Sequence, residues 1–393
     1  MVKAIKVMLI PNNVQKTKMF QYAGASRFAY NWALAREKEN YEKCGRFISD
    51  SELRKEFTKL RHSDEYAWLL NISNNVTKQA IKDACTAYKN FFKGLQKFPR
   101  FKSRKRSMPK FYQDNVKIRF SNTHVKFEGF SSSRKANKQK MNWVRLAEHG
   151  RIPTDVKYMN PRISFDGLNW WISVCVEFPD CKETLNDDGV GIDLGIKDLA
   201  VCSDAVKYKN INKSQKVKKL EKQKRRLQRS ISRSYEKNKK GESYCKTNNV
   251  IKKEKLLLKR NHRLTNIRKN YLNQTISEIV NRKPRFICIE DLNVSGMMKN
   301  RHLSKAVQEQ GFFWFRKQLE YKCSDKGIQL IVADRFYPSS KLCSCCGNIK
   351  KDLKLSDRVY RCECGNMIDR DFQASINPVS YTHLRAHETL MNL

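Results

Sequence analysis

The chain has 393 residues, 40% of them hydrophobic, which is enough for about two or three domains. It carries 80 Lys and Arg against 39 Asp and Glu, a formal net charge of +41, and such self-repulsion predicts a polyanionic partner, foremost nucleic acid. We find no apolar run of about 18 residues, no basic amphipathic anchor and no signal peptide, so we expect a cytoplasmic protein without a membrane partner.

The first third of the chain predicts a strand, a group of helices and a basic segment. "MVKAIKVMLIPNN" is typical of a short strand and a turn, and residues 13–92 repeat apolar side chains at helical spacing. Residues 93–110 hold eight Lys or Arg among eighteen positions and no acid, interleaved with Phe98 and Phe101. A solvated linker is the alternative, but this alternation is typical of a surface that follows a nucleic-acid backbone and stacks bases. We predict nucleic-acid contacts from Lys97, Arg100, Lys102, Arg104, Lys105 and Arg106.

The middle of the chain changes from alternating runs to a long basic insertion. Residues from about 113 to 185 contain runs such as "NWWISVCVEF" that predict a small β-rich module. Residues 207–282 then carry apolar positions on one face of each half, which predicts two helices folded as a hairpin with its turn near "KNKKGESYCKTNN". Residues 207–270 hold 24 Lys or Arg against 4 Glu, an excess that a merely solvated face does not need. We predict nucleic-acid contacts from Lys218, Lys219, Arg225 and Arg226.

Three acidic residues occupy unusual positions in the second half. Asp193 lies inside an otherwise apolar strand, Glu290 ends another short apolar strand, and Asp371 opens a predicted helix. Any one of them alone is better explained as an N-cap or a surface residue. Together they stand at the edges of βαβ-type elements, with a predicted helix at 303–326 and a strand "IQLIVAD" between them. We therefore predict carboxylates that converge at the carboxyl end of a mixed sheet and hold divalent cations.

Thirteen cysteines, an odd number, do not indicate a disulfide framework in a cytosolic chain. Eight are scattered, Cys181 among them, and are interpreted as small core residues, whereas five crowd between residues 343 and 364. Two pairs there, C-x-x-C and C-x-C, are each followed by glycine, and free buried thiols are the alternative to a metal site. Cys345 is interpreted as a spectator. The predicted ligands of one structural Zn²⁺, which would supply folding energy to a segment too short for a core, are Cys343, Cys346, Cys362 and Cys364.

Three segments carry a resemblance to a known family: "GIDLGIK", "IEDLN" and "RFYPSSKLCSCCGNIKKDLKLSDRVYRCECGNMIDRDFQASIN". They resemble the RuvC-type nuclease motifs and zinc ribbon of the TnpB (OrfB) family of insertion-sequence-encoded, RNA-guided DNA endonucleases, which are related to compact type V CRISPR effectors. The resemblance covers residues 1–378 and is strongest from residue 186 onward. It implies an α+β multidomain fold: an RNase H-like RuvC nuclease domain with a zinc ribbon, a β-barrel wedge module and a helical recognition lobe.

The resemblance also implies a division of the chain. The expected parts are the first wedge strand at 1–12, the recognition lobe at 13–112, the wedge module at 113–184, the RuvC domain at 185–342 with the basic hairpin 207–282 inserted, the zinc ribbon at 343–366, the last RuvC motif at 367–378 and a tail of non-native origin at 379–393. The tail "VSYTHLRAHETLMNL" is similar to a translated cloning adapter. We do not expect it to continue the closing helix, and we assign no role to His383 or His387.

The family's catalytic positions fall on Asp193, Glu290 and Asp371, which implies that these residues hold two Mg²⁺. Such a pair activates water on one side of a phosphodiester and stabilises the leaving oxygen on the other. The family match, and not spacing, favours Asp371 over Asp369. Arg370 between them either orients the phosphate or pairs with a carboxylate.

The sequence departs from the family pattern at two places, and two further residues correspond to the family only loosely. Gln373 stands where the family has Asn, so a hydrogen bond made there must reach one methylene farther. The second cysteine pair is one residue shorter than the commoner C-x-x-C. Lys78 and Gln79 correspond loosely to readers of the short DNA motif beside the target.

The leading hypothesis is a transposon-associated, RNA-guided DNA endonuclease of the prokaryotic cytoplasm, located on the nucleoid when bound to its target. It would use a structured guide RNA, double-stranded target DNA, two Mg²⁺ and one structural Zn²⁺. A nuclease-silent RNA-guided repressor is an alternative that the three intact acids disfavour, and a strand-joining transposase would need a second site that the sequence lacks. A small type V CRISPR effector would differ in the DNA that flanks its gene.

Overall fold

The computed structural model describes residues 1–130, 141–179, 183–354 and 357–391, with residues 381–391 described by their backbone alone. Cys181 and residues 355–356 of the expected ribbon hairpin lie outside these ranges. The chain divides into two compact units, Met1–Pro179 and Asp180–Leu393. Within the described ranges, no helix combines the length and apolar character needed to cross a membrane.

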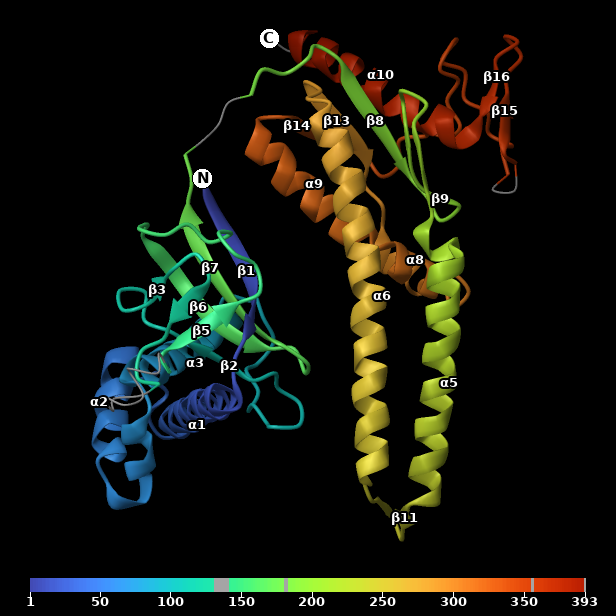
Figure 1. Ribbon diagram of the computed structural model, residues 1–393. Helices are drawn as coiled ribbons and strands as arrows, with labels where there is room; N and C mark the ends of the chain where they lie inside the picture. Colours follow the sequence, from blue (N-terminus) through green and yellow to red (C-terminus); the bar gives the residue numbers. More distant parts are fainter. Residues whose placement is uncertain (131–140, 180–182, 355–356, 392–393) are drawn as a thin grey trace. The chain divides into compact units, whose positions relative to one another are not determined.

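A seven-stranded antiparallel sheet forms the centre of the first unit, with strand order β2-β6-β7-β1-β5-β4-β3 (Figure 1). The strands confirm the β-rich module expected between about residues 113 and 185. Alternate residues of β7, Ile172 and Val174, are fully buried, and so is Val7 of the neighbouring β1, which pairs with Ile172. The bounds are β1 Val2–Ile10, β2 Lys110–Tyr112, β3 Arg119–Phe120, β4 His124–Lys126, β5 Trp143–Leu146, β6 Tyr158–Phe165 and β7 Trp170–Glu177.

Helices fill the segment between β1 and β2, as the apolar spacing of residues 13–92 predicts. They are α1 Asn13–Cys44, α2 Asp50–Arg61, the 3₁₀ helix η1 Asp64–Asn71 and α3 Asn74–Phe92. A capping box between Asn12 and Gln15 starts α1, and Gly45 ends it with a left-handed φ of 64°. Tyr22 of α1 packs edge-on against Phe111 of β2, with ring centroids 5.5 Å apart, so helices and sheet share one core.

A five-stranded mixed sheet forms the centre of the second unit, in the order β10-β9-β8-β13-β14. Strands β8, β13 and β14 are parallel, while β9 and β10 are antiparallel to their neighbours. The strand bounds are β8 Gly189–Leu194, β9 Asp198–Cys202, β10 Lys207–Lys209, β13 Phe286–Glu290 and β14 Gln329–Ala333. This arrangement confirms the strands expected around Asp193 and Glu290.

Different helices cover the two faces of this sheet. One face contributes Val190, Ile192, Ile287 and Ile289 to a core shared with α6 (Asn248–Asn281) and α9 (Phe312–Lys326). Gly191 of β8 points to the other face, because successive strand residues alternate. There α10 (Arg370–Met391) passes so close that a Cβ on Gly191 would lie 1.9 Å from the backbone oxygen of Ser375. Only glycine admits the helix at this distance.

The basic insertion forms the expected helical hairpin. Helices α5 (Gln215–Lys237) and α6 run side by side, joined through the short strands β11 (Lys239–Lys240) and β12 (Ser243–Tyr244) (Figure 1). Val217 and Leu220 of α5 pack against Leu264 of α6. Side chains of Ser214 and Thr247 cap the two helices. The 3₁₀ helix η2 (Ile211–Lys213) precedes α5.

Two expectations about helices were wrong. The helix expected at 303–326 is two helices, α8 (Ser304–Gln310) and α9, because Gly311 adopts a left-handed φ of 70° and ends α8. The closing helix α10 also continues past Pro378 to Met391. Pro378 removes one backbone donor but does not end the helix, and the following residues include helix formers such as Leu384 and Ala386. The composition of the tail therefore did not predict its conformation. A short helix α7 (Val294–Met297) precedes α8.

Candidate active site and metal centre

Asp193 and Glu290 lie side by side at the carboxyl ends of parallel strands. In the register of β8 and β13, Ile192 pairs with Ile289, and each acid follows this pair by one residue. Asp193 is two residues beyond Gly191, so it points to the face that α10 covers, and the register gives Glu290 the same direction. The carboxyl end of parallel strands is where ligands bind in sheets of this kind.

Asp371 lies in the first turn of α10, on the same face. Burial raises the pKa of Asp193 well above its ordinary value, and the negative charges of Glu290 and Asp371 raise it further, while Arg370 acts in the opposite direction. The charges of Glu290 and Asp371 therefore both act on Asp193, and α10 packs on the sheet face to which Asp193 and Glu290 point. The three acids do not form a tight cage: in the described ranges, only the four cysteines gather their ligand atoms closely enough for one ion.

Ser339 holds Glu290 and was not predicted from the sequence. Its Oγ donates a hydrogen bond to Oε1 of Glu290, which acts to lower the carboxyl pKa, although burial is the larger influence and the net pKa is raised. Ser339 is buried, and its carbonyl accepts a 2.5 Å hydrogen bond from Nδ2 of Asn377 in α10. Ser339, which precedes the ribbon, thus links Glu290 of β13 to α10, the helix that carries Asp371. The sequence segment "YPSS" does not by itself predict this contact.

Asp369 and Asp371 have different surroundings. Oδ1 of Asp369 accepts hydrogen bonds from the backbone N–H groups of Asp371, at 3.0 Å, and Phe372, at 3.1 Å, so Asp369 is the N-cap of α10. Burial acts to raise the pKa of Asp369, but the Phe372 N–H and Lys207, 3.4 Å away, outweigh it, and the net pKa is lowered. Asp371 lies 3.4 Å from Nη2 of Arg370, so of the two interpretations of Arg370 the carboxylate pair is present.

A second group of charges lies next to Glu290. Asp291 forms ion pairs with Arg316, at 2.6 Å, and Arg335, at 2.5 Å, and these guanidinium groups lower its pKa. Both arginines and Glu290 line a cavity of about 170 Å³. Positive charge therefore borders the acid site on the β13 side. The sequence did not signal this, because the three charged residues come from separate segments.

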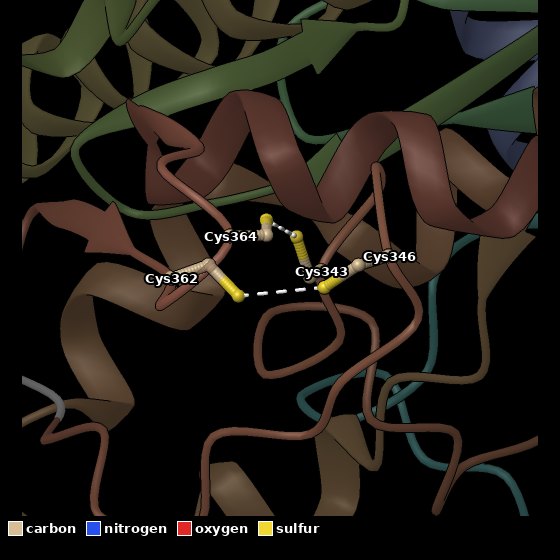
Figure 2. Close-up of side chains that lie close together, drawn as sticks. All are labelled: Cys343, Cys346, Cys362 and Cys364. Atoms are coloured by element: carbon tan, nitrogen blue, oxygen red, sulfur yellow. Dashed lines mark hydrogen bonds between the residues drawn. The ribbon is translucent and has the colours of Figure 1, made fainter.

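The four predicted zinc ligands converge (Figure 2). Their Sγ atoms all lie within 4.8 Å of one another, with Cys343 and Cys364 at 3.7 Å and Cys346 and Cys362 at 3.5 Å. Four sulfurs at Zn–S distances of about 2.3 Å in a tetrahedron are about 3.8 Å apart, so the cluster fits this ion. Cys345 is exposed and lies outside the cluster.

Two glycine turns and a hairpin hold the cluster. Gly347 and Gly365 adopt left-handed φ angles of 73° and 89°, as expected of the glycine after each cysteine pair. Backbone N–H groups of Cys345 and Cys346 and the side chain of Asn366 lower the pKa of Cys343 to about 6, although burial acts to raise it. The C-x-C pair thus reaches the same cluster as the longer pair. The hairpin strands are β15 Val359–Arg361 and β16 Met367–Asp369.

The ribbon is attached directly to α10. Nε2 of Gln373, a fully buried residue, donates to the backbone oxygen of Leu342, and Oε1 of Gln373 accepts from Oγ of Ser344 at 3.0 Å. The backbone N–H of Arg370 donates to the oxygen of Arg358 at 2.9 Å. The longer glutamine at position 373 therefore spans from the helix to the ribbon, and hydrogen bonds connect the ribbon directly to the helix that carries Asp371.

Most residues predicted to contact nucleic acid are exposed, but two are half-buried and contact other side chains of the protein. Gln79 is half-buried, and its Nε2 donates to Asp83 at 2.9 Å. Lys102 is also half-buried, with its Nζ 3.0 Å from the centre of the Tyr30 ring, so it differs from its exposed neighbours. The exposed members are Lys78, Lys97, Arg100, Arg104, Lys105, Arg106, Lys218, Lys219, Arg225 and Arg226.

Comparison with known proteins identifies the family. Residues 173–301 match the family OrfB_IS605, described as "Probable transposase", residues 1–46 a family described as "Helix-turn-helix domain", and residues 312–378 one described as "Cas12f1-like, TNB domain". The chain is 30% identical to "Putative RNA-guided DNA endonuclease InsQ" of Escherichia coli (strain K12) over 379 residues, covering 92% of this chain and 87% of the relative. The chain therefore belongs to the TnpB (OrfB) family.

Two further comparisons extend over nearly the whole chain. A "Putative RNA-guided DNA endonuclease" of Streptomyces pristinaespiralis is 29% identical over 377 residues, covering 95% of this chain and 88% of the relative. A solved structure described as "Cryo-EM structure of the Cas12f1-sgRNA-target DNA complex" superposes with a TM-score of 0.59 and 12% identity, covering 96% of this chain and 98% of that chain. The mixed α/β fold thus resembles that of a compact Cas12 effector.

Proposed function

We propose that the chain is a transposon-associated, RNA-guided DNA endonuclease that hydrolyses phosphodiester bonds of target DNA at a single site. Its catalytic residues are Asp193, Glu290 and Asp371. One observation carries the proposal: Asp193 and Glu290 from distant segments point to the same face at the carboxyl end of one sheet, and the charges of Glu290 and Asp371 both raise the pKa of Asp193. The endonuclease names of relatives that align with most of the chain support it.

The acid site fits divalent cations. Carboxylates are the ligands that Mg²⁺ prefers. Burial raises the pKa of Asp193 and of Glu290, and neighbouring negative charge raises that of Asp193 further, so a bound cation would offset the cost of ionising these groups. Asp193, Glu290 and Asp371 would hold two Mg²⁺, which would supply an activated water for the attack on the phosphodiester and stabilise the leaving oxygen.

The residues of the chain have separate tasks in this mechanism. Asp193 and Glu290 provide ligands from adjacent strands, and Asp371 provides one from α10. Ser339 orients the Glu290 carboxylate. Asp369 holds the first turn of α10, and so the position of Asp371. On the rim, Arg335 is the more exposed of the two arginines beside Glu290 and fits a phosphate of the substrate strand.

The cysteine cluster fits one structural Zn²⁺. The four sulfurs would occupy all four positions of a tetrahedral ion, which would leave none for substrate. The ribbon has few apolar residues of its own, although Tyr360 is fully buried and its hydroxyl donates to the oxygens of Lys341 and Asn348. Zinc then stabilises the ribbon, and the ribbon positions α10 without taking part in the reaction.

The finer domain assignment is part of the proposal. Residues 185–342 and 367–378 form an RNase H-like RuvC domain, with the basic hairpin inserted and residues 343–366 as the zinc ribbon. The first unit combines the wedge module with a helical recognition lobe. A formal charge of +41 and the exposed lysines and arginines of α5 support a structured guide RNA as partner in the cytoplasm, with double-stranded DNA as the target.

A cleavage assay with the natural complex tests the proposed function. RNA that copurifies with the protein is sequenced, and a plasmid carrying a matching target is offered with a randomised flank. We expect cutting with Mg²⁺ and none with EDTA, while Asp193→Ala binds the target on filters without cutting it. Target binding without cutting by the unaltered protein would instead identify a repressor, and no RNA-dependent binding at all would refute the proposal.

A further inference from the structure

The first unit contains a cavity of about 750 Å³ to which the proposed function assigns no ligand. It lies between α1, the loop 104–109 and the turn after β6, and none of the described residues that line it is acidic. Phe20, 45% exposed, forms part of its wall and packs edge-on against Phe165, with ring centroids 5.2 Å apart. The cations that line it are Arg27, Arg104, Lys105 and Arg106. Its volume is within the range of about 300–1,000 Å³ typical of small-ligand sites.

The walls of this cavity are held in place. Asn31 of α1 exchanges two 2.8 Å hydrogen bonds with the backbone of Lys102, at one end of the basic loop. At the other end, the N–H of Phe165 donates to the oxygen of Pro109 at 2.9 Å. Between them, a 2.9 Å hydrogen bond from the Ser107 N–H to the Ser103 oxygen closes the turn that presents the three loop cations. A preformed site of this kind loses little entropy when a ligand binds.

The absence of a side chain at Gly24 leaves part of the cavity open. Gly24 lies in the interior of α1, where glycine is less favourable than every residue except proline. Its φ is not left-handed, and a Cβ would meet nothing within 4 Å, so neither the backbone nor the packing requires glycine. Gly24 lines the cavity, and any longer side chain there would project into it.

We propose that this cavity binds one unpaired nucleotide of RNA, with the base against Phe20 and the phosphates on Arg27 and the loop cations. Aromatic side chains stack on any base, and the cations suit phosphate. RNA, more than duplex DNA, offers single bases splayed out of loops and bulges for such recognition. The inference rests on the proposed function in taking RNA as the partner, and it adds a nucleotide site that the charge pattern alone does not define.

Ultraviolet crosslinking of the purified complex tests this site. The RNA that copurifies with the full chain is the probe, and mass spectrometry locates nucleotide adducts on peptides. We expect a ribonucleotide adduct on the peptide that contains Phe20. Gly24→Leu should remove the adduct and weaken binding of the same RNA about tenfold, without lowering the thermal midpoint, because leucine favours a helix more than glycine.

Phe20→Leu provides a second variant and should have the same effect on affinity and on the adduct. Its matched control is Phe336→Leu, which alters a phenylalanine that is 88% exposed in the second unit and should leave the affinity unchanged. Arg27→Gln should weaken binding and reduce the salt slope by about one, whereas Lys16→Gln, which alters an exposed cation of α1 outside the cavity, should do neither.

The outcomes separate the nucleotide site from the proposed function. A copurified RNA that crosslinks elsewhere but not at Phe20, or an adduct that survives Gly24→Leu, would overturn the site and leave the proposed function standing. If no RNA copurifies, the proposed function fails by itself, and crosslinking with added eight-nucleotide RNA and DNA of one sequence decides the site. An adduct with RNA then supports it, and an adduct with DNA alone or with neither contradicts it.

Discussion

The cysteine cluster and the acid site are both candidate metal centres, but the chain builds them in different ways. The four cysteines lie between residues 343 and 364, and two glycine turns bring their sulfurs within 4.8 Å of one another. The three acids lie between residues 193 and 371, on two strands and a helix, and they form no group of comparable tightness within the described ranges. One centre depends on local turns, and the other on the packing of α10 against the sheet.

Their electrostatics differ as well. In the cysteine cluster, hydrogen-bond donors outweigh burial and lower the pKa of Cys343 to about 6, while hydrogen bonds among the neighbouring cysteines raise the pKa of Cys364 to about 12, so the four thiols share their protons unevenly. In the acid site, burial and neighbouring negative charge raise the pKa of Asp193. The comparison teaches that the local centre is suited to stabilise a fold, whereas the distributed centre keeps unfavourable charge that a functional cation can use.

Loss of a zinc ligand should have the largest effect. Structural zinc contributes about 10–16 kcal/mol to small domains of this kind, so Cys364→Ser should lose the metal, unfold the ribbon and abolish cleavage. Zinc content by mass spectrometry and proteolysis of the ribbon are the measurements. Cys345→Ser is the matched control and should keep full zinc, because its exposed sulfur lies outside the cluster. A Cys364→Ser protein with full zinc occupancy would show that another group is the fourth ligand.

Gly191→Ala should break the acid site while leaving every carboxylate and cysteine in place. The new Cβ would lie 1.9 Å from the backbone oxygen of Ser375, so α10 must move and carry Asp371 with it. A displacement of about 1 Å at a reacting group costs about 10²-fold in rate, which is the loss of cleavage that we expect. Zinc content should not change.

Cleavage by Gly191→Ala at the rate of the unaltered protein would mean that the close approach of α10 does not position Asp371.

Ser339→Ala should have a smaller effect, about tenfold on kcat, because one hydrogen bond to a charged group is lost. The bond lowers the pKa of Glu290, so its removal should also shift the acidic limb of the pH–rate profile to higher pH. The control is Ser344→Ala, whose Oγ contacts Gln373 and not Glu290. A fall in activity with an unchanged pH profile would assign Ser339 a purely structural role.

Lys102→Met should have the smallest effect on cleavage, because it should act on stability alone. Burial lowers the pKa of Lys102 from 10.5 to about 7. Between these values the unfolded chain binds the proton and the folded chain does not, so stability rises with pH across this window and the gain is absent below pH 7.

Urea unfolding from pH 6 to pH 10 measures this contribution as the difference between the two proteins. The curve of Lys102→Met should be flatter than that of the unaltered chain. Lys105→Met, which alters an exposed neighbour, should follow the unaltered chain. Parallel curves for Lys102→Met and the unaltered protein would contradict the buried position of the amine.

The sequence predicted local features well and long-range ones only in part. Apolar alternation located β8 and β13, helical spacing located α5 and α6, and the cysteine spacing located the cluster, because each signal lies within a short segment. Ser339, the arginines beside Asp291 and the fit of Gly191 under α10 could not be predicted, since each depends on a contact between distant segments. The break at Gly311 was visible only as a glycine inside an apolar pattern.

The most direct test of the account compares the two aspartates at the start of α10. Asp371→Ala should abolish Mg²⁺-dependent cleavage of a target plasmid by the RNA complex while leaving target binding intact, because Asp371 is a proposed metal ligand. Asp369→Ala should keep measurable cleavage and lower the stability of the closing helix by about 1 kcal/mol, because it removes an N-cap. Robust cutting by Asp371→Ala together with inactivity of Asp369→Ala would contradict the assignment of the acid site.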